Sequence, residues 1–156
     1  MHIRLLAVGG RQPSWVDDAF STYTARFPHE WKFRLDTIAT ARRNKNAKSQ
    51  AAKEIEGKQI LAKLKSAERV VLLDERGKQL TSALLESTLA EWQRERRDLC
   101  FVVGGPDGIS DACRHRANFI WSLSDLTLPH GLVRVLLAEQ LYRAWSLHAG
   151  HPYHRA

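Results

Sequence analysis

Cysteine is scarce in this sequence: two residues among 156, too few for the disulfide framework of a small secreted domain. No apolar run approaches the roughly 20 residues that a helix needs to cross a bilayer. The first eight residues lack the length and the cleavage site of a signal peptide, and they fit a first strand instead. These absences lead us to expect a cytoplasmic protein with no membrane partner.

Several familiar site motifs are also missing. The chain has neither the GxGxxG spacing of dinucleotide-binding folds nor the GxxxxGK[ST] loop of phosphate-binding NTPases. No clustered carboxylate pair is evident, which further disfavours a nucleotide hydrolase. His151 and His154 are spaced like metal ligands, but no cysteine pair or third ligand accompanies them. We therefore predict no metal site.

Acidic residues are outnumbered by basic ones, 17 to 24, which leaves a net charge of +7. A basic balance favours polyanionic partners, because lysine and arginine release counterions from phosphates, although it also serves simple solubility. Basic residues gather within residues 41–65, where most fit a solvated helix face. The portion at 42–46 is less helix-like and is predicted to be a basic loop able to track a phosphate backbone.

Strand patterns alternate with helix patterns along the chain. We predict strands at residues 3–8, 33–38, 70–73, 99–103 and 119–123, and helices at 14–27, 48–65, 82–96, 110–116 and 132–148. Such alternation is typical of an α/β fold with a mostly parallel sheet and helices on both faces. Because no repeat, low-complexity stretch or linker interrupts the pattern, residues 1–156 are predicted to form one domain.

Ligands of parallel sheets bind at the carboxyl ends of the strands, which makes the residues after each strand candidate site residues. Residues 104–108 read Gly-Gly-Pro-Asp-Gly, whose glycines let a ligand approach the backbone, although a plain tight turn has the same composition. Residues 124–129 read Ser-Asp-Leu-Thr-Leu-Pro and could hold an adenine between leucine walls, or simply connect a strand to a helix. Gly9-Gly10 and Leu73-Asp74-Glu75 follow two other strands.

The last helix and the tail after it carry unusual side chains. The helix at 132–148 is apolar over more than one stripe, which suggests burial on most sides, in part by a second subunit. Arg134 and Arg143 interrupt this surface; they either snorkel, pair with Glu139 or face an anionic substrate. Residues 151–155 read His-Pro-Tyr-His-Arg, side chains that can stack on an RNA base and contact phosphate.

In this order, the segments resemble the RlmH family of ribosomal RNA large-subunit methyltransferases, within the SPOUT class. The resemblance covers nearly the whole chain and is closest in its C-terminal part. The motifs that carry it are Leu5-Leu-Ala-Val-Gly9, Leu73-Asp74, Gly104-Gly-Pro-x-Gly108, Trp121-Ser-Leu-Ser124, Leu126-Thr-Leu-Pro-His130, Leu132-Val-Arg-Val135, Leu141-Tyr-Arg-Ala-Trp-Ser146 and His151-Pro-Tyr-His-Arg155.

This resemblance implies properties that spacing alone does not show. The C-terminal segment would thread through a loop as a trefoil knot, which general folds almost never contain. The protein would be a homodimer with each active site at the subunit interface, and its cofactor would be S-adenosyl-L-methionine. Carried over by position, the cofactor contacts would be Leu73, Asp74, Gly104, Gly105, Ser124, Asp125, Leu126, Thr127, Leu128 and Pro129.

The reaction that the resemblance implies is methylation at N3 of a pseudouridine in the 23S RNA of the assembled ribosome. Because the imide N3 carries a proton at neutral pH, the enzyme must remove that proton or stabilise the resulting anion. His154 or His130 would take the proton, Arg155 would stabilise the developing charge, and Tyr153 would orient the base. The alternative is a non-enzymatic ribosome-binding assembly factor that uses the same basic residues and has no cofactor pocket.

Overall fold

The structure is a computed structural model that describes residues 1–42 and 49–155, so most of the basic loop predicted at 42–46 lies outside the described residues. Its strands are β1 (Ile3–Val8), β2 (Arg34–Ile38), β3 (Arg69–Gln79), β4 (Leu99–Val103) and β5 (Phe119–Ser122). Its helices are α1 (Ser14–Thr24), α2 (Ser49–Lys63), α3 (Ser82–Arg94), α4 (Asp111–Arg116) and α5 (His130–Ala149), with 3-10 turns η1 (His29–Trp31) and η2 (Pro152–Arg155).

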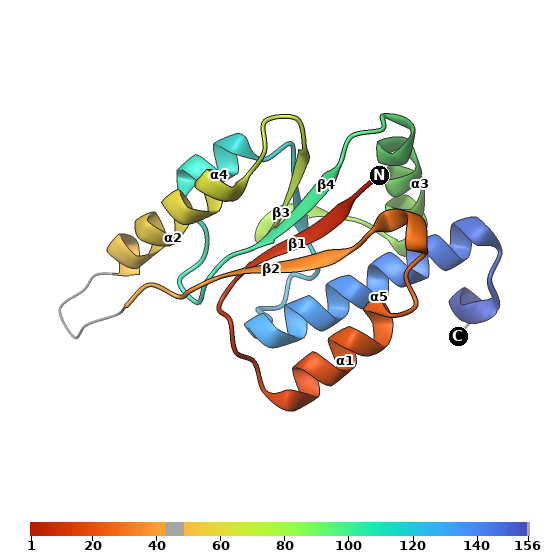
Figure 1. Ribbon diagram of the computed structural model, residues 1–156, viewed down its shortest axis with the longest axis horizontal. Coiled ribbons are helices and arrows are strands. Elements are labelled where there is room, and N and C mark those ends of the chain that lie inside the picture. Colours follow the sequence, from red (N-terminus) through yellow and green to blue (C-terminus); the bar gives the residue numbers. More distant parts are fainter. Residues whose placement is uncertain (43–48, 156) are drawn as a thin grey trace.

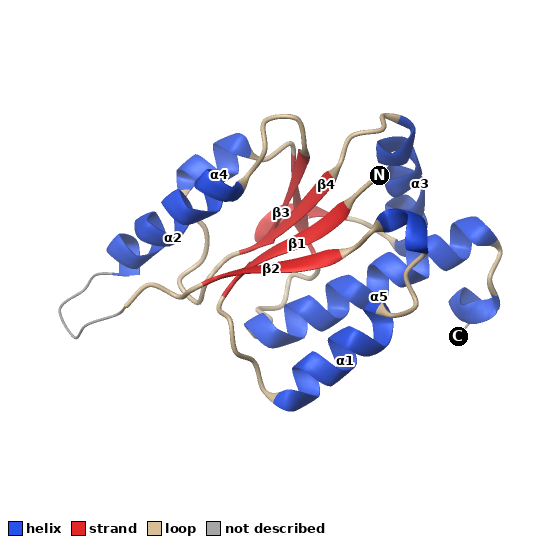
Figure 2. Cartoon of the chain, viewed as in Figure 1, coloured by secondary structure: helices blue, strands red, loops and turns tan. Residues whose placement is uncertain are grey.

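The strands form one sheet in the order β2-β1-β4-β3-β5, and every neighbouring pair is parallel (Figures 1 and 2). All strands therefore start at one edge of the sheet and end at the other. We call these the amino edge and the carboxyl edge. The predicted parallel α/β sheet is confirmed, and its carboxyl edge gathers the loops that were predicted to form the site.

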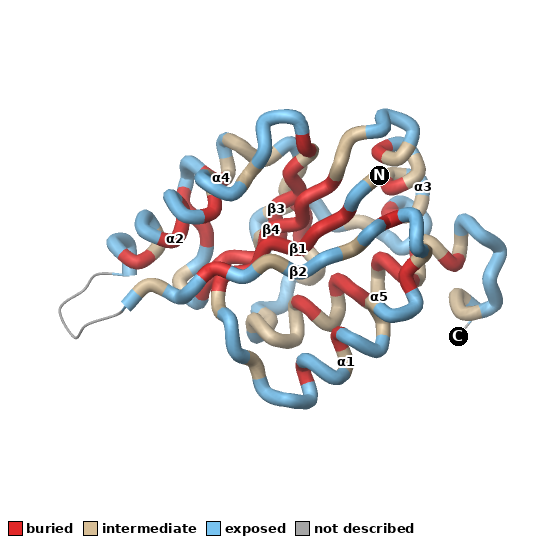
Figure 3. The backbone as a smooth tube through the Cα atoms, viewed as in Figure 1, coloured by how far each residue is buried: buried red, intermediate tan, exposed pale blue. Residues whose placement is uncertain are grey.

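Helices cover both faces of the sheet because successive side chains of each strand point to opposite sides. Leu5, Val71 and Phe101 pack on one face with α1, α3 and α5. Leu6 and Leu72 pack on the other face with α2 and α4. The central strands are consequently the most deeply buried part of the molecule (Figure 3), which explains their continuous apolar runs.

Strand β3 is longer than its apolar run predicts, since it continues past Leu73 to Gln79. Its pairing with β5 shifts register, so that both Leu73 and Lys78 lie opposite Trp121. Gly77 allows this return to β5, because a Cβ there would lie 2.7 Å from the backbone carbon and oxygen of Ile120. The bulge interrupts the pairing between residues 73 and 78, at the carboxyl edge.

Helix ends differ slightly from the prediction. Helix α1 ends at Thr24, three residues early, and α3 ends at Arg94, two residues early. Helix α5 starts at His130, directly after Pro129, and ends at Ala149; Gly150, with a φ of +70°, forms its left-handed C-cap. Among the described residues, no helix has both the length and the apolar character that crossing a membrane requires.

Candidate active site

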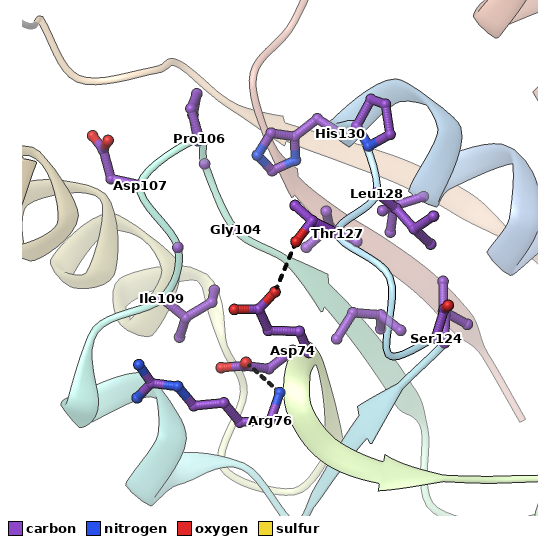
Figure 4. Close-up of a pocket in the computed structure, with 18 of the residues that line it drawn as sticks. Asp74, Arg76, Gly104, Pro106, Asp107, Ile109, Ser124, Thr127, Leu128 and His130 are labelled. Atoms are coloured by element: carbon purple, nitrogen blue, oxygen red, sulfur yellow. Dashed lines mark hydrogen bonds between the residues drawn. The ribbon is translucent and has the colours of Figure 1, made fainter.

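A cavity of about 490 Å³ opens at the carboxyl edge, where β3, β4 and β5 end (Figure 4). Its size falls in the range of about 300–1,000 Å³ that small-molecule sites occupy. Its apolar lining consists of Leu73, Val103, Ile109, Trp121, Leu123, Leu126, Leu128 and Val133. Its charged and titratable lining consists of Lys53, Asp74, Glu75, Arg76, Asp107, Arg114 and His130.

The glycine-rich loop after β4 forms one wall. Gly105 and Gly108 form an isolated bridge in which the Gly108 amide donates to the Gly105 carbonyl at 3.0 Å. Gly108 has a φ of +93°, a left-handed conformation that favours glycine. Gly105 lies so close to α2 that a Cβ on it would be 2.3 Å from Oε1 of Glu56. This wall therefore needs glycine both for its turn and for its contact with α2.

Glu56 was not among the residues that the sequence singled out. Its side chain is buried, and Oε2 accepts a hydrogen bond from the Ala41 amide at 3.0 Å. The signal that could have found it is its spacing: it lies four residues from both Ala52 and Ile60, on the buried stripe of α2. A carboxylate at that position supports the loop after β2 while it contacts the glycine-rich wall.

The loop after β5 forms the opposite wall and is held by short-range hydrogen bonds. The Ser122 hydroxyl donates to the Ser124 carbonyl at 2.9 Å, and the Leu126 amide donates to the Ser124 hydroxyl at 2.9 Å. Thr127 reaches across to Glu75, with 3.5 Å between Oγ1 and Oε2 (Figure 4). Leu126 keeps 72% of its surface exposed, so an apolar side chain stands at the mouth of the cavity.

Asp74 is held in place by cationic and backbone donors. Its Oδ2 accepts from Nε of Arg114 at 2.9 Å and pairs with the second guanidinium nitrogen at 2.8 Å, while Oδ1 accepts from the Arg76 amide at 3.0 Å. Burial alone would lower the pKa of Arg114, but the hydrogen bond and charge of Asp74 raise it. Arg114 therefore stays cationic inside the cavity, and no sequence pattern had marked it for this role.

His130 and Arg134 lie on the first turns of α5. His130 lines the cavity and is half-buried. Arg134 is only 2% exposed and donates to the carbonyl of Gly9, so it fixes the loop after β1 instead of snorkelling to solvent. Burial lowers the pKa of Arg134, and the charge of Asp17 opposes that shift.

The tail folds back against the second half of α5. The Tyr153 hydroxyl donates to Oε1 of Glu139 at 3.0 Å, and its ring lies 4.7 Å from that of Tyr142. Arg143 pairs with the same Glu139 oxygen at 2.6 Å, which is one of the pairings expected for it. Burial raises the pKa of Tyr153, with further contributions from its hydrogen bonds to Tyr23 and Glu139. The Tyr153 side chain is therefore a neutral anchor for η2.

The predicted catalytic residues do not meet within one chain. Helix α5 has twenty residues and spans roughly 30 Å, with His130 at one end and the tail beyond the other (Figure 1). Tyr153, His154 and Arg155 do not line the cavity, and the buried Nδ1 of His154 has no hydrogen-bond partner in the described structure. Nine of the ten predicted cofactor residues do line it; Asp125, which is exposed, does not.

The described residues offer no set of side chains that could bind a metal ion. In residues 1–42 and 49–155, no group of three or more His, Cys, Asp or Glu side chains is arranged to hold an ion. What the cavity offers is apolar walls, exposed loop backbone and charges of both signs, a set that suits an organic ligand carrying an aromatic ring and both charges.

Comparison with known proteins adds a family match over nearly the full chain. The family model described as a predicted SPOUT methyltransferase matches residues 1–154. Proteins named Ribosomal RNA large subunit methyltransferase H from Hahella chejuensis and Thioalkalivibrio sulfidiphilus are each 50% identical over 155 residues, which is 99% of this chain and 99% of theirs. The structure of a probable methylase family protein from Haemophilus influenzae aligns with a TM-score of 0.55 over 97% of this chain and 69% of its own, at 10% identity, a likeness of fold alone.

Proposed function

This chain belongs to the SPOUT methyltransferase family, and on that premise we propose that it is a ribosomal RNA methyltransferase. In full, it transfers a methyl group from S-adenosylmethionine to N3 of a pseudouridine in 23S RNA of the assembled ribosome. The whole of residues 1–156 acts as one catalytic domain in the cytoplasm. The observation that carries the proposal is the carboxyl-edge cavity, lined by two loops that also carry the family's motifs.

The cavity fits S-adenosylmethionine in size and in donor set. Leu73, Trp121 and Leu128 offer apolar surface to an adenine, and the loop backbones at 104–108 and 124–129 offer amides and carbonyls to its edges. Asp74 is paired with Arg114, and the carboxylates of Glu75 and Asp107 also line the cavity, where they can meet the positive sulfonium and ammonium groups of the cofactor. When bound, this cofactor supplies an electrophilic methyl group.

The chain's own residues must then make N3 of the base nucleophilic. His130 lines the cavity, and His154 is the histidine of the tail that could serve the same role. One of these two imidazoles takes the N3 proton, directly or through water. Arg155 is exposed and offers a guanidinium to the negative charge that develops on the imide oxygens. Tyr153 orients the base by fixing the turn that carries His154 and Arg155, because its hydroxyl is bonded to Glu139.

A homodimer supplies each cavity with the tail of the other subunit. Two observations support this part of the proposal. None of Tyr153, His154 and Arg155 lines its own cavity; the Tyr153 hydroxyl is bonded to Glu139, roughly 14 Å along α5 from His130. Helix α5 also leaves Leu132, Val135 and Leu136 only half-buried, and Trp15 on the adjacent α1 is 58% exposed. An apolar surface of this kind is typical of subunit interfaces.

The trefoil knot is part of the same proposal. Support comes from the family match and from the loops after β4 and β5, which face each other across one cavity, as two segments of a knotted loop would. Such a crossing would also explain why α5 starts so close to the glycine-rich wall. The knot would serve function by holding the bound cofactor in a bent form, because the two knotted loops cannot easily move apart.

The test is methyl transfer from labelled S-adenosylmethionine to ribosomes that lack this modification, followed by identification of the labelled nucleoside. We expect label in N3-methylpseudouridine of large-subunit RNA from whole ribosomes, and little from separate subunits or free RNA. If none of these substrates is labelled and calorimetry detects no cofactor binding at millimolar concentration, the proposal fails and a non-enzymatic assembly factor replaces it.

A further inference from the structure

The positive charge of this protein is concentrated at the amino edge of the sheet, far from the cavity. The segments that lead into the five strands are residues 2–4, 32–36, 63–69, 94–99 and 115–119. They contain ten lysines and arginines against four aspartates and glutamates. This excess of six positive charges accounts for nearly all of the chain's net charge of +7.

Strand pairing and hydrogen bonds join these segments into one surface. Leu99 pairs with Ile3 on one side and with Arg69 on the other, so the starts of β1, β3 and β4 are level. Arg97 donates to the carbonyls of Ala67 and Glu68, each at 3.1 Å. The connections before β3 and β4 are therefore held together by a guanidinium.

A second arginine completes the same arrangement. Arg116, which ends α4, donates to the Lys65 carbonyl at 2.8 Å and to the Glu68 carbonyl at 3.3 Å. Carbonyl oxygens fix the direction of both guanidinium groups without neutralising their charge. Arginines held in this way lose little conformational entropy when they bind an anion.

The carboxylates of this edge are already used. Asp36 and Glu68 pair with Arg4, and Glu95 pairs with Arg69. Asp98 accepts the backbone amide of His2 at 2.8 Å. Seven cations of these segments have no carboxylate partner in the part of the chain that the structure describes; we call them the basic edge: Lys32, Lys63, Lys65, Arg94, Arg96, Arg97 and Arg116.

The basic edge is also concave. A second cavity of about 290 Å³ lies there, and Lys32, Lys65 and the Arg4–Glu68 pair are among the residues that line it. Lys32 and Lys65 are both exposed, whereas Arg4 and Glu68 are buried. Two ammonium groups and the Arg34 guanidinium that line one hollow can donate to the non-bridging oxygens of a phosphate.

We propose that the basic edge is a second RNA-binding surface, which holds the phosphate backbone of a folded RNA whose target base lies elsewhere, in a catalytic cavity. The choice of RNA as the polyanion rests on the proposed function. The two edges are separated by the length of a strand, about 17–20 Å for five or six residues. An RNA that contacts both must therefore be a large folded structure and not a short single strand.

A membrane is the other polyanionic partner that lysines and arginines could meet. Peripheral membrane binding usually adds apolar side chains that insert between lipids. Of the five exposed large apolar side chains of the described residues, Trp15, Ile55, Leu84 and Leu126 lie outside the segments of the basic edge, and a single one, Leu35 at 37% exposure, lies within them. The observations favour RNA, and lipid vesicles serve as the comparison in the test.

The test is binding of full-length protein to large-subunit ribosomal RNA, measured by fluorescence anisotropy over a range of salt concentrations. Lys65→Gln should make the slope of log K against log salt shallower by about one, and Lys32→Gln with Lys65→Gln by about two, since each lost phosphate contact removes roughly 0.9 from the slope. Lys58→Gln is the matched control, because Lys58 is an exposed lysine of α2 outside the basic edge.

Two further readouts separate this proposal from the methyltransferase proposal. Affinity for S-adenosylmethionine should stay within twofold in all variants, and a ten-nucleotide RNA should give the same slope with wild type and with the double variant. The proposal is overturned if the variants keep the wild-type slope, if Lys58→Gln changes it equally, or if vesicles rich in phosphatidylglycerol bind through these lysines and RNA does not. Absence of methyl transfer would leave the RNA-binding result standing.

Discussion

The two edges of one sheet have opposite chemistry in this protein. At the carboxyl edge, the lysine and arginines that line the cavity (Lys53, Arg76 and Arg114) are matched by three carboxylates, and the surrounding loops are rich in glycine and proline. At the amino edge, cations exceed carboxylates by ten to four, and the five segments contain neither glycine nor proline. One edge is shaped to enclose a small molecule, and the other is charged to attract a large one.

The difference has a physical origin. A charge enclosed by protein needs an opposite charge or hydrogen-bond partners, because desolvation otherwise costs several kcal/mol; Asp74 and Arg114 pair inside the cavity, and the buried Arg134 donates to the Gly9 carbonyl. A charge at an open edge keeps its hydration and can remain unpaired, where it attracts polyanions over about a Debye length of 8–10 Å. Charge balance within the cavity and charge excess outside it are therefore expected of an enzyme with a small cofactor and a nucleic-acid substrate.

The largest expected effect comes from the histidines at the two ends of α5. His130→Ala and His154→Ala should each be tested, and loss of the proton acceptor should lower kcat about 100- to 10,000-fold at saturating substrate. If both variants keep near-wild-type rates, neither histidine is the essential base. Methyl transfer to ribosomes is the measurement, with cofactor affinity as the control for folding.

Mixed dimers of those variants test whether the tail acts across the interface, provided that both homodimers are impaired. With tails acting in trans, a His130→Ala subunit paired with a His154→Ala subunit leaves one cavity intact and recovers up to half of the activity per dimer. With tails acting in cis, every cavity keeps one defect and the mixture stays inactive.

A smaller effect is expected from the glycine-rich wall of the cavity. Gly105→Ala would place a Cβ 2.3 Å from Oε1 of Glu56, so the wall must move. We expect affinity for S-adenosylmethionine to fall about 10- to 100-fold, which corresponds to roughly 1.4–3 kcal/mol. Gly10→Ala is the control, since a Cβ there meets nothing within 4 Å. Equal calorimetric affinities for the two variants would exclude the loop from the cofactor site.

The smallest effect concerns the sheet interior between the two edges. Burial raises the pKa of Cys100 to about 12, from its usual 9.0, although the charge of Arg4 opposes the shift. Above pH 9 the unfolded chain therefore releases this proton while the folded chain keeps it, and the free energy of unfolding falls as pH rises. The loss should be about 1 kcal/mol by pH 10, and it vanishes below pH 9.

Denaturant unfolding at several pH values, with Cys100→Ala as the control, measures this contribution. The control should lack that part of the pH dependence, whatever its own stability. Rapid modification of Cys100 in the folded protein by a thiol reagent below pH 9 would contradict the assignment, because a buried neutral thiol is unreactive.

Sequence patterns were sufficient for the strands and for the two loops of the cavity. Four of the five strands lie within one residue of their predicted ends. For β1 and β4 the signal is a nearly continuous apolar run, because these strands are buried on both sides, whereas β2 is largely exposed and has no such run. Residues 104–108 and 124–129 were found by their place after strands, since parallel strands all end at one edge. The β3 bulge was missed because Asp74, Glu75 and Lys78 are polar, and only contact with β5 makes that stretch a strand.

Other site features had no local signal. Arg114 contacts Asp74, and Glu56 contacts Gly105, across about 40 to 50 residues of sequence. Such long-range contacts produce no recognisable pattern among the residues next to either partner. The basic edge was equally invisible, because its cations are scattered through five segments from residue 2 to residue 119. Net charge suggested a polyanion partner without indicating where that partner binds.

Local residue patterns were therefore enough to predict the α/β class, the parallel sheet and the position of the cavity. The reason is that buried strands require apolar residues, and turns require glycine or proline, at neighbouring positions. Tertiary packing alone assigned Arg114 to Asp74, turned Arg134 inward to Gly9, and packed the tail against the second half of α5, outside the cavity. It also brought the cations of five connections to one edge. Such assignments depend on which distant segments meet, and that is decided by the order in which the strands pair in the sheet.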